Sequence, residues 1–140
     1  MKTISFSPPD ITEAEIKEVA EALRSGWITT GPRTKKLEKE IANYCGTNKV
    51  VCLNSATASL ELNLRVLGIG PGDEVITSAY TYTASASVID HIGAKIVLID
   101  TAAGSYEMDY EKLESVITER TKAIIPVDLA GIPCLSLIHI

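Results

Sequence analysis

Short, nearly continuous apolar runs alternate with amphipathic helical patterns over most of the chain, and this alternation is the strongest constraint on the fold. Strands that are apolar on both faces are typical of a sheet covered by helices on both sides. The pattern therefore predicts an α/β domain with a mostly parallel sheet and flanking helices. The β-rich runs occupy residues 50–53, 74–77, 95–99 and 123–127. Pro126 lacks the N–H for a ladder bond, so it should face a sheet edge or a bend.

Helical patterns lie before and between these runs. The first helix should open with a capping box formed by Thr12 and Glu15. A second helix places Leu37, Ile41 and Ala42 at helical spacing on one face, which predicts that they point inward. Three further helices are expected over 58–67, 84–92 and 109–117, the last with Asp109 as its N-cap.

Composition narrows the class of protein. The chain has 140 residues, enough for one domain, and 46% of them are hydrophobic. Its net charge of -5 argues against nucleic acid or an anionic membrane surface as a partner, so small molecules are expected instead. The three cysteines lack the spacing of a zinc site and are interpreted as reduced, structural thiols. The first residues show no signal peptide and no run of about 18 apolar residues occurs, so a cytoplasmic protein is expected.

The last six residues, 135–140, do not continue the pattern of the chain. Their sequence, Leu-Ser-Leu-Ile-His-Ile, resembles the translation of a transposon-derived sequencing adaptor. We therefore predict an incomplete domain over residues 1–134, followed by a non-native tail over 135–140. A genuine terminal strand is the alternative.

The segment 54–59, Asn-Ser-Ala-Thr-Ala-Ser, is a first candidate for ligand binding. It lies where a strand is expected to end and a helix to begin, a position at which free backbone N–H groups and the helix dipole attract anions. Small side chains leave room there for a phosphate. The spacing is neither GxGxxG nor the P-loop pattern. As the alternative, Ser55 or Thr57 merely caps the helix.

The segment 78–83, Ser-Ala-Tyr-Thr-Tyr-Thr, is a second candidate because it directly follows an expected strand. Ligands of open α/β sheets bind outside the carboxyl ends of the strands, so this segment and the first should converge. Tyr82 can offer a flat ring there. The alternative is that both tyrosines are ordinary packing residues.

Together with other motifs, these segments resemble the DegT/StrS family of nucleotide-sugar aminotransferases. The resemblance extends from residue 7 to 134 and includes, in order, 26–32, 55–60, 70–76, 81–82, 93–95, Asp100 and 117–127. It implies the large domain of an aspartate-aminotransferase-like protein of fold type I, which binds pyridoxal 5'-phosphate (PLP). It also implies a homodimeric enzyme that passes an amino group, usually from glutamate, to a keto sugar on a nucleotide.

The resemblance also assigns site residues. Positions matching Ala56 and Thr57 hold the cofactor phosphate in the family, and the aromatic residue matching Tyr82 stacks on the pyridine ring. With Ser55, these form the predicted cofactor site. Ala56 is commonly Gly in the family, and the change still leaves room for a phosphate. The segment matching 27–32 lies near the active site in these dimers.

No catalytic residue is expected within this chain. In the family, the acid that pairs with the pyridine nitrogen and the lysine that binds the cofactor covalently both follow the position of Cys134. The chain is therefore interpreted as an inactive N-terminal fragment. Asp128 stands where many members have His, and we interpret it as a solvated or hydrogen-bonded loop carboxylate. Lysines present here match no such motif and are interpreted as solvated charges: Lys35, Lys49, Lys95, Lys112 and Lys122.

Three alternatives for the whole protein remain open at this point. Some relatives are sugar dehydratases, which use the same cofactor with His in place of the lysine. A relative can also keep the fold as a binding or regulatory protein without the chemistry. A stand-alone nucleotide-binding module is disfavoured, because no phosphate-loop or dinucleotide fingerprint is present.

Overall fold

The computed structural model describes residues 8–134 in two compact units, which divide after Cys52. The first unit contains helix α1, Glu13–Arg24, and helix α2, Pro32–Cys45. α1 begins with the expected capping box: Thr12 Oγ1 accepts from the N–H of Ala14 at 3.2 Å, and the Glu15 carboxylate accepts from the N–H of Thr12 at 2.6 Å. Two of the four N–H groups that a helix start leaves unpaired are thereby satisfied.

The apolar side chains of α2 are more exposed than expected. Leu37 and Ile41 are 49% and 37% exposed, and no residue of α1 or α2 is buried. The prediction that Leu37, Ile41 and Ala42 point inward is therefore wrong for the first two, while Ala42 is half-buried. Helical spacing defines an apolar face, but only a packing partner buries it, and the described residues of the first unit supply none here.

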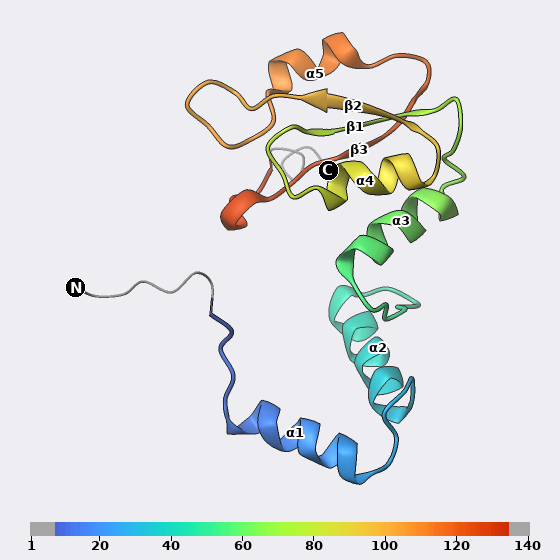
Figure 1. Cartoon of the computed structure of the whole chain (residues 1–140), viewed down its shortest axis with the longest axis vertical. Coiled ribbons are helices and arrows are strands. Elements are labelled where there is room, and N and C mark those ends of the chain that lie inside the picture. Colours follow the sequence, from blue (N-terminus) through green and yellow to red (C-terminus); the bar gives the residue numbers. More distant parts are fainter. Residues whose placement is uncertain (1–7, 135–140) are drawn as a thin grey trace, which may run out of the picture. The chain divides into compact units, whose positions relative to one another are not determined.

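The second unit is the α/β part of the chain. Its chain order is α3, β1, α4, β2, α5, β3 and a short 3₁₀ helix, η1 (Figure 1). The bounds are Ala56–Val66 for α3, Glu74–Ser78 for β1, Ala84–His91 for α4, Lys95–Ile99 for β2, Tyr110–Val116 for α5, Thr121–Ile125 for β3 and Leu129–Gly131 for η1. The Asp109 side chain caps α5 as expected, accepting from the N–H of Lys112 at 3.3 Å.

The three strands form a parallel sheet in the order β2-β1-β3, so β1 lies in the middle. Both crossovers run through helices, which is the usual connection between parallel strands. α5 lies on one face of the sheet, and α4 lies on the other with α3 packed against it (Figure 1). The expected fold class, an α/β domain with a parallel sheet and flanking helices, is confirmed.

The core lies on both faces of β1, because successive side chains of a strand point to opposite sides. Val75 packs in a cluster with residues of α3 and α4, including Leu64, Val88 and Ile89. Ile76 points the other way and packs with Ile99 and Met108 on the α5 side. All five residues of β1 are buried, which explains their unbroken apolar or small character after Glu74.

Two strand predictions have different outcomes. Residues 50–53 form no strand among the described residues, and this prediction is wrong; the N–H of Cys52 instead donates to Glu38 Oε1 at 3.1 Å. A β-rich run becomes a strand only where a neighbouring strand accepts its hydrogen bonds. The strand expected over 123–127 is found two residues earlier, as β3, and ends before Pro126 instead of containing it. β3 lies at the side of the three-stranded sheet, which agrees with the expectation that Pro126 faces a sheet edge or a bend. The predicted tail, 135–140, lies outside the described residues.

Candidate functional site

The start of α3 provides groups that can hold an anion. Ser55 is the N-cap, and its Oγ accepts from the N–H of Ala58 at 3.1 Å. The capping alternative is thus observed for Ser55, but a hydroxyl that accepts one hydrogen bond can still donate its own hydrogen. The N–H groups of Ala56 and Thr57 point out of the first turn without acceptors inside the helix. Ser55 and Ala56 are exposed, and Thr57 is half-buried.

The loop after β1, residues 79–83, carries the second candidate. Tyr82 is 81% exposed, so the residues described here do not bury it in a core. Its backbone carbonyl accepts from the N–H of Ser85 at 3.1 Å, which joins the loop to the first turn of α4. An exposed aromatic ring on a well-bonded backbone is a suitable surface for a planar ligand.

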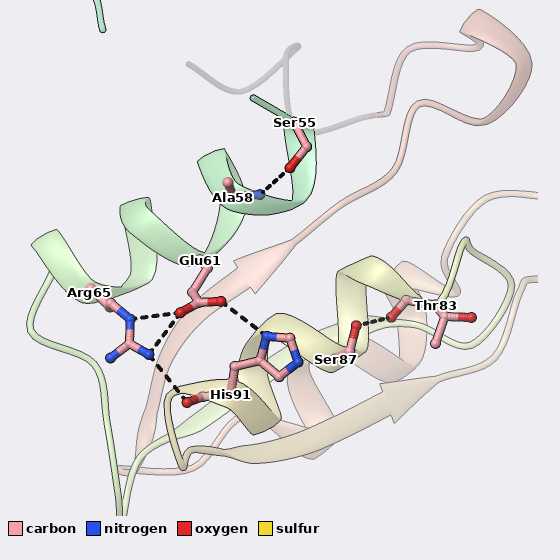
Figure 2. A network of polar contacts seen from close by, with 7 residues as sticks. All are labelled: Ser55, Ala58, Glu61, Arg65, Thr83, Ser87 and His91. Atoms are coloured by element: carbon pink, nitrogen blue, oxygen red, sulfur yellow. Dashed lines mark hydrogen bonds and ion pairs between the residues drawn. The ribbon is translucent and has the colours of Figure 1, made fainter. Parts of the chain in front are cut away.

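The fold brings these two segments to the same edge of the sheet. Figure 2 shows Ser55 at the start of α3 and Thr83 at the start of α4, on the side toward which the strand arrows point. Tyr82 immediately precedes Thr83 and follows the end of β1. Both segments therefore lie toward the carboxyl ends of the strands, the usual place for ligands in open α/β sheets, and their convergence on one ligand stays a prediction.

A polar network joins the other halves of the same two helices (Figure 2). Glu61 of α3 accepts from Arg65 Nε at 2.9 Å and lies 3.0 Å from His91 Nδ1 of α4. Arg65 also donates to the carbonyl oxygen of His91 at 3.4 Å. The hydrogen bond from Arg65, followed by that with His91, holds the pKa of Glu61 below its usual value.

Sequence reasoning missed this network. Its Glu61 and Arg65 half stands at the helical i, i+4 spacing that favours ion pairs, so that half was detectable. The His91 half was not, because 30 residues separate it from Glu61.

The opposite edge of the sheet holds a buried carboxylate. Glu74, at the start of β1, is 2% exposed. It accepts hydrogen bonds from Thr118 Oγ1 at 2.8 Å, Arg120 Nη2 at 2.9 Å and Lys95 Nζ at 3.0 Å. The bond from Thr118, then that from Lys95, keeps the pKa of Glu74 below its usual value. These residues stand at the beginnings of all three strands or just before them, so the network ties the amino edge together.

Several lysines are paired rather than simply solvated. Lys35, Lys95 and Lys112 contact Glu38, Glu74 and Asp109 respectively, and Lys122 Nζ donates to the carbonyl oxygen of Glu119. The side chains of Lys35, Lys95 and Lys112 remain 70%, 66% and 67% exposed, so they are solvated as interpreted and also have structural partners, in a helix, at a strand end and at a helix cap.

Asp128 and the three cysteines are the other side chains that the sequence analysis singled out. Asp128 Oδ1 accepts from the N–H of Cys134 at 2.8 Å, a bond that lowers the pKa of Asp128, so it is the hydrogen-bonded loop carboxylate of our interpretation. The three cysteines are free thiols. Between residues 8 and 134, no group of three or more His, Cys, Asp or Glu is placed to hold a metal ion, and no helix is long and apolar enough to cross a membrane.

Comparison with known proteins decides the family. Residues 9–140 match the model of the DegT/DnrJ/EryC1/StrS aminotransferase family. The chain belongs to this family. The resemblance found in the motifs is thereby confirmed, and so is the fold: it is the α/β architecture of PLP-dependent aminotransferases of fold type I, of which this chain forms a part.

Individual relatives agree with the family match. A UDP-4-amino-4-deoxy-L-arabinose–oxoglutarate aminotransferase of Shewanella sediminis is 50% identical over 88% of this chain and 32% of its own length. The spore coat polysaccharide biosynthesis protein SpsC of Bacillus subtilis is 45% identical over 94% of this chain and 34% of its length. This chain therefore spans about a third of the length of these relatives.

One similar protein of known structure has been solved with the cofactor. A putative sugar aminotransferase of Streptococcus pneumoniae is 66% identical over 95% of this chain and 34% of its own, with a TM-score of 0.88. That protein has been crystallised in PLP, PMP (pyridoxamine phosphate) and apo forms.

Proposed function

We propose that the chain is the N-terminal third of a PLP-dependent aminotransferase that transfers an amino group from an amino acid, with glutamate as donor, to a nucleotide-linked keto sugar. We place this reaction in cell-surface polysaccharide or amino-sugar biosynthesis. The observation that supports it most is that α3 and α4 both begin toward the carboxyl edge of the sheet, with Tyr82 just before α4, in a chain that belongs to an aminotransferase family. The names of the relatives, which include a sugar-nucleotide aminotransferase, support the substrate class.

The residues at this edge fit PLP in their chemistry. A phosphate needs N–H and O–H donors without large side chains in the way, and Ser55, Ala56 and Thr57 at the start of α3 supply them. A pyridine ring needs a flat apolar surface, which the exposed Tyr82 ring offers. When bound, the cofactor supplies an electron-withdrawing ring that carries the amino group between donor and acceptor. The role of these four residues is to anchor the phosphate and to orient the ring.

The covalent chemistry is assigned to residues beyond this third of the protein. Lys35, Lys95 and Lys112 are each paired with a carboxylate, of Glu38, Glu74 and Asp109 respectively, which supports leaving them outside the catalytic machinery. A homodimeric state and a cytoplasmic location stay predictions from the resemblance and the composition.

The test uses the full-length protein that contains this segment, incubated with PLP, glutamate and nucleotide-linked keto sugars. We expect formation of 2-oxoglutarate and of the amino sugar in equal amounts. Loss of water from the sugar without a new amine would identify a dehydratase. PLP binding without turnover of any tested sugar would favour the regulatory alternative, and absence of PLP binding would overturn the proposal.

The 140-residue chain by itself should transaminate nothing, because the lysine and the acid that the family uses are expected further along the protein. Its exposed apolar side chains also favour aggregation when it is expressed alone. Aminotransfer by the purified 140-residue chain would contradict this division of roles.

A further inference from the structure

The loop that carries Tyr82 is held at several points of its backbone. The N–H of Ala79 donates to the carbonyl oxygen of Ile99 at 2.7 Å, which ties the start of the loop to the end of β2. The N–H of Tyr80 donates to Ser78 Oγ at 3.2 Å. At its far end, Thr81 Oγ1 and Ser85 Oγ share a hydrogen bond of 3.0 Å.

One further contact comes from outside the loop. The rings of Tyr80 and Tyr106 are stacked, with centroids 5.7 Å apart and an interplanar angle of 23°. Both side chains are largely exposed, at 54% and 61%. In this unit Tyr80 therefore contributes little to the core, and its ring is ordered by Tyr106.

Tyr106 itself stands on a firmly anchored segment between β2 and α5. Thr101 and Met108 form an antiparallel bridge, and Met108 is buried at 3% exposure. Within the bend, the N–H of Ala102 donates to the carbonyl oxygen of Glu107 at 3.0 Å, and the N–H of Glu107 donates to Ser105 Oγ at 3.0 Å. Tyr106 thus acts as a fixed support, while the loop of Tyr80 and Tyr82 rests against it.

We propose that Tyr106 is a positioning residue for the cofactor site: by stacking on Tyr80 it restrains the loop 79–83 and so fixes the ring of Tyr82 two residues further on. This inference rests on the proposed PLP site. An exposed loop samples many conformations, and cofactor affinity falls in proportion to the fraction that is competent to bind. An aromatic stack contributes enough to change that fraction by about two- to tenfold.

The test compares Tyr106→Ala with Tyr106→Phe in the full-length protein. We expect Tyr106→Ala to weaken PLP binding by about two- to tenfold and to alter the visible circular dichroism of the bound cofactor, which reports the orientation of its ring. Tyr106→Phe keeps the stacking ring and should bind PLP like wild type. The melting temperature of the apo protein should stay unchanged in Tyr106→Phe and fall only slightly in Tyr106→Ala, because the stack is small compared with the stability of a whole domain. Tyr44→Ala, which removes a ring that is 93% exposed on α2, is the matched control and should change none of these quantities.

A second measurement tests, without any cofactor, whether the stack of Tyr106 on Tyr80 restrains the loop 79–83. Hydrogen exchange of the backbone amides of residues 79–83 in the apo protein should be faster in Tyr106→Ala than in wild type, and unchanged in Tyr106→Phe. If wild type binds no PLP, the proposed function fails, but this exchange measurement still shows whether Tyr106 restrains the loop. Unchanged exchange in Tyr106→Ala would overturn the inference. So would unchanged PLP affinity together with a raised KM for the sugar nucleotide, which would make Tyr106 a substrate contact instead.

Discussion

The two edges of the sheet use polar residues in opposite ways. At the amino edge, Glu74 is buried and accepts hydrogen bonds from Thr118, Arg120 and Lys95. At the carboxyl edge, Ser55 and Ala56 are exposed, and the Tyr82 ring is 81% exposed. Polar groups of the first edge are satisfied by the protein, whereas those of the second remain available to a ligand.

Under the proposed function, this difference separates stability from cofactor binding within one small sheet. A buried carboxylate is tolerated only when charged and polar partners compensate for its lost hydration, so the amino edge belongs to the folding energetics. Exposed donors at a helix start contribute little to folding but can bind an anion. The contrast predicts that substitutions at the amino edge change stability, whereas those at the carboxyl edge change cofactor affinity and cost stability only where they remove a helix cap, as at Ser55.

The largest expected effect is that of Glu74→Gln on stability. The amide keeps the shape of the side chain but leaves Lys95 and Arg120 without their counterion, so the melting temperature of the full-length protein should fall by several degrees. Cofactor affinity of the folded fraction should not change. Glu119→Gln is the matched control, because Glu119 is an exposed carboxylate in the same turn as Thr118. Equal melting temperatures for the two variants would remove the distinction between the edges.

Acid provides a second test of the amino edge. The folded-state pKa of Glu74 lies below its usual value of 4.5, chiefly through the bond from Thr118. A depressed carboxyl pKa stabilises the folded state above the usual value, and this contribution is lost as the pH falls from 4.5 through the folded-state pKa. Melting curves should therefore show a steeper acid loss for wild type than for Glu74→Gln. Because Glu61, Asp109 and Asp128 also have lowered pKa values, the difference between the two proteins is the measured quantity.

The sequence could predict the features that arise from neighbouring residues. The capping box at Thr12 and the N-cap at Asp109 both follow from local chemistry. The two candidate segments were also found locally, as small or aromatic residues next to strand and helix ends.

Long-range features were beyond such reasoning. The contact of Arg120 with Glu74 spans 46 residues, and that of His91 with Glu61 spans 30. The stack of Tyr80 on Tyr106 likewise depends on the sheet bringing two loops together. The failure of the strand at 50–53 has the same cause, since a β-rich run needs a partner that the run itself does not specify.

At the carboxyl edge, Thr57→Ala should weaken cofactor binding by about 1 to 3 kcal/mol, the range for a lost hydrogen bond to a charged group. The fold should survive, because Ala is a good helix former. Ser55→Ala is the informative companion: it removes the observed cap and should also cost about 0.5 to 2 kcal/mol of stability. PLP titration and apo melting of both variants check this. If Thr57→Ala binds PLP as tightly as wild type, Thr57 has only a structural role.

The smallest expected effect is that of substitutions at Tyr82. This residue distinguishes a ring that stacks on the cofactor from a ring that packs in the protein core. If its ring lies over the cofactor, Tyr82→Phe and Tyr82→Trp keep a flat face and should retain most of the affinity. Tyr82→Ala removes the stack, which contributes about 0.5 to 1.5 kcal/mol beyond the buried area, so PLP should bind several-fold more weakly. Absorbance titration of the full-length apo protein with PLP measures this for all three variants.

Apo-protein melting gives the opposite prediction for the packing alternative. A core tyrosine replaced by alanine would leave a cavity and cost about 3 to 5 kcal/mol of stability, with or without cofactor. The 81% exposure of Tyr82 instead predicts an unchanged apo melting temperature, as for Tyr44→Ala, where the original ring is 93% exposed. A large loss of apo stability in Tyr82→Ala, with unaltered PLP affinity in the protein that still folds, would show that Tyr82 contributes to stability, like Glu74 at the amino edge, and not to cofactor binding. The assignment of this edge to cofactor binding would then rest on the α3 start alone.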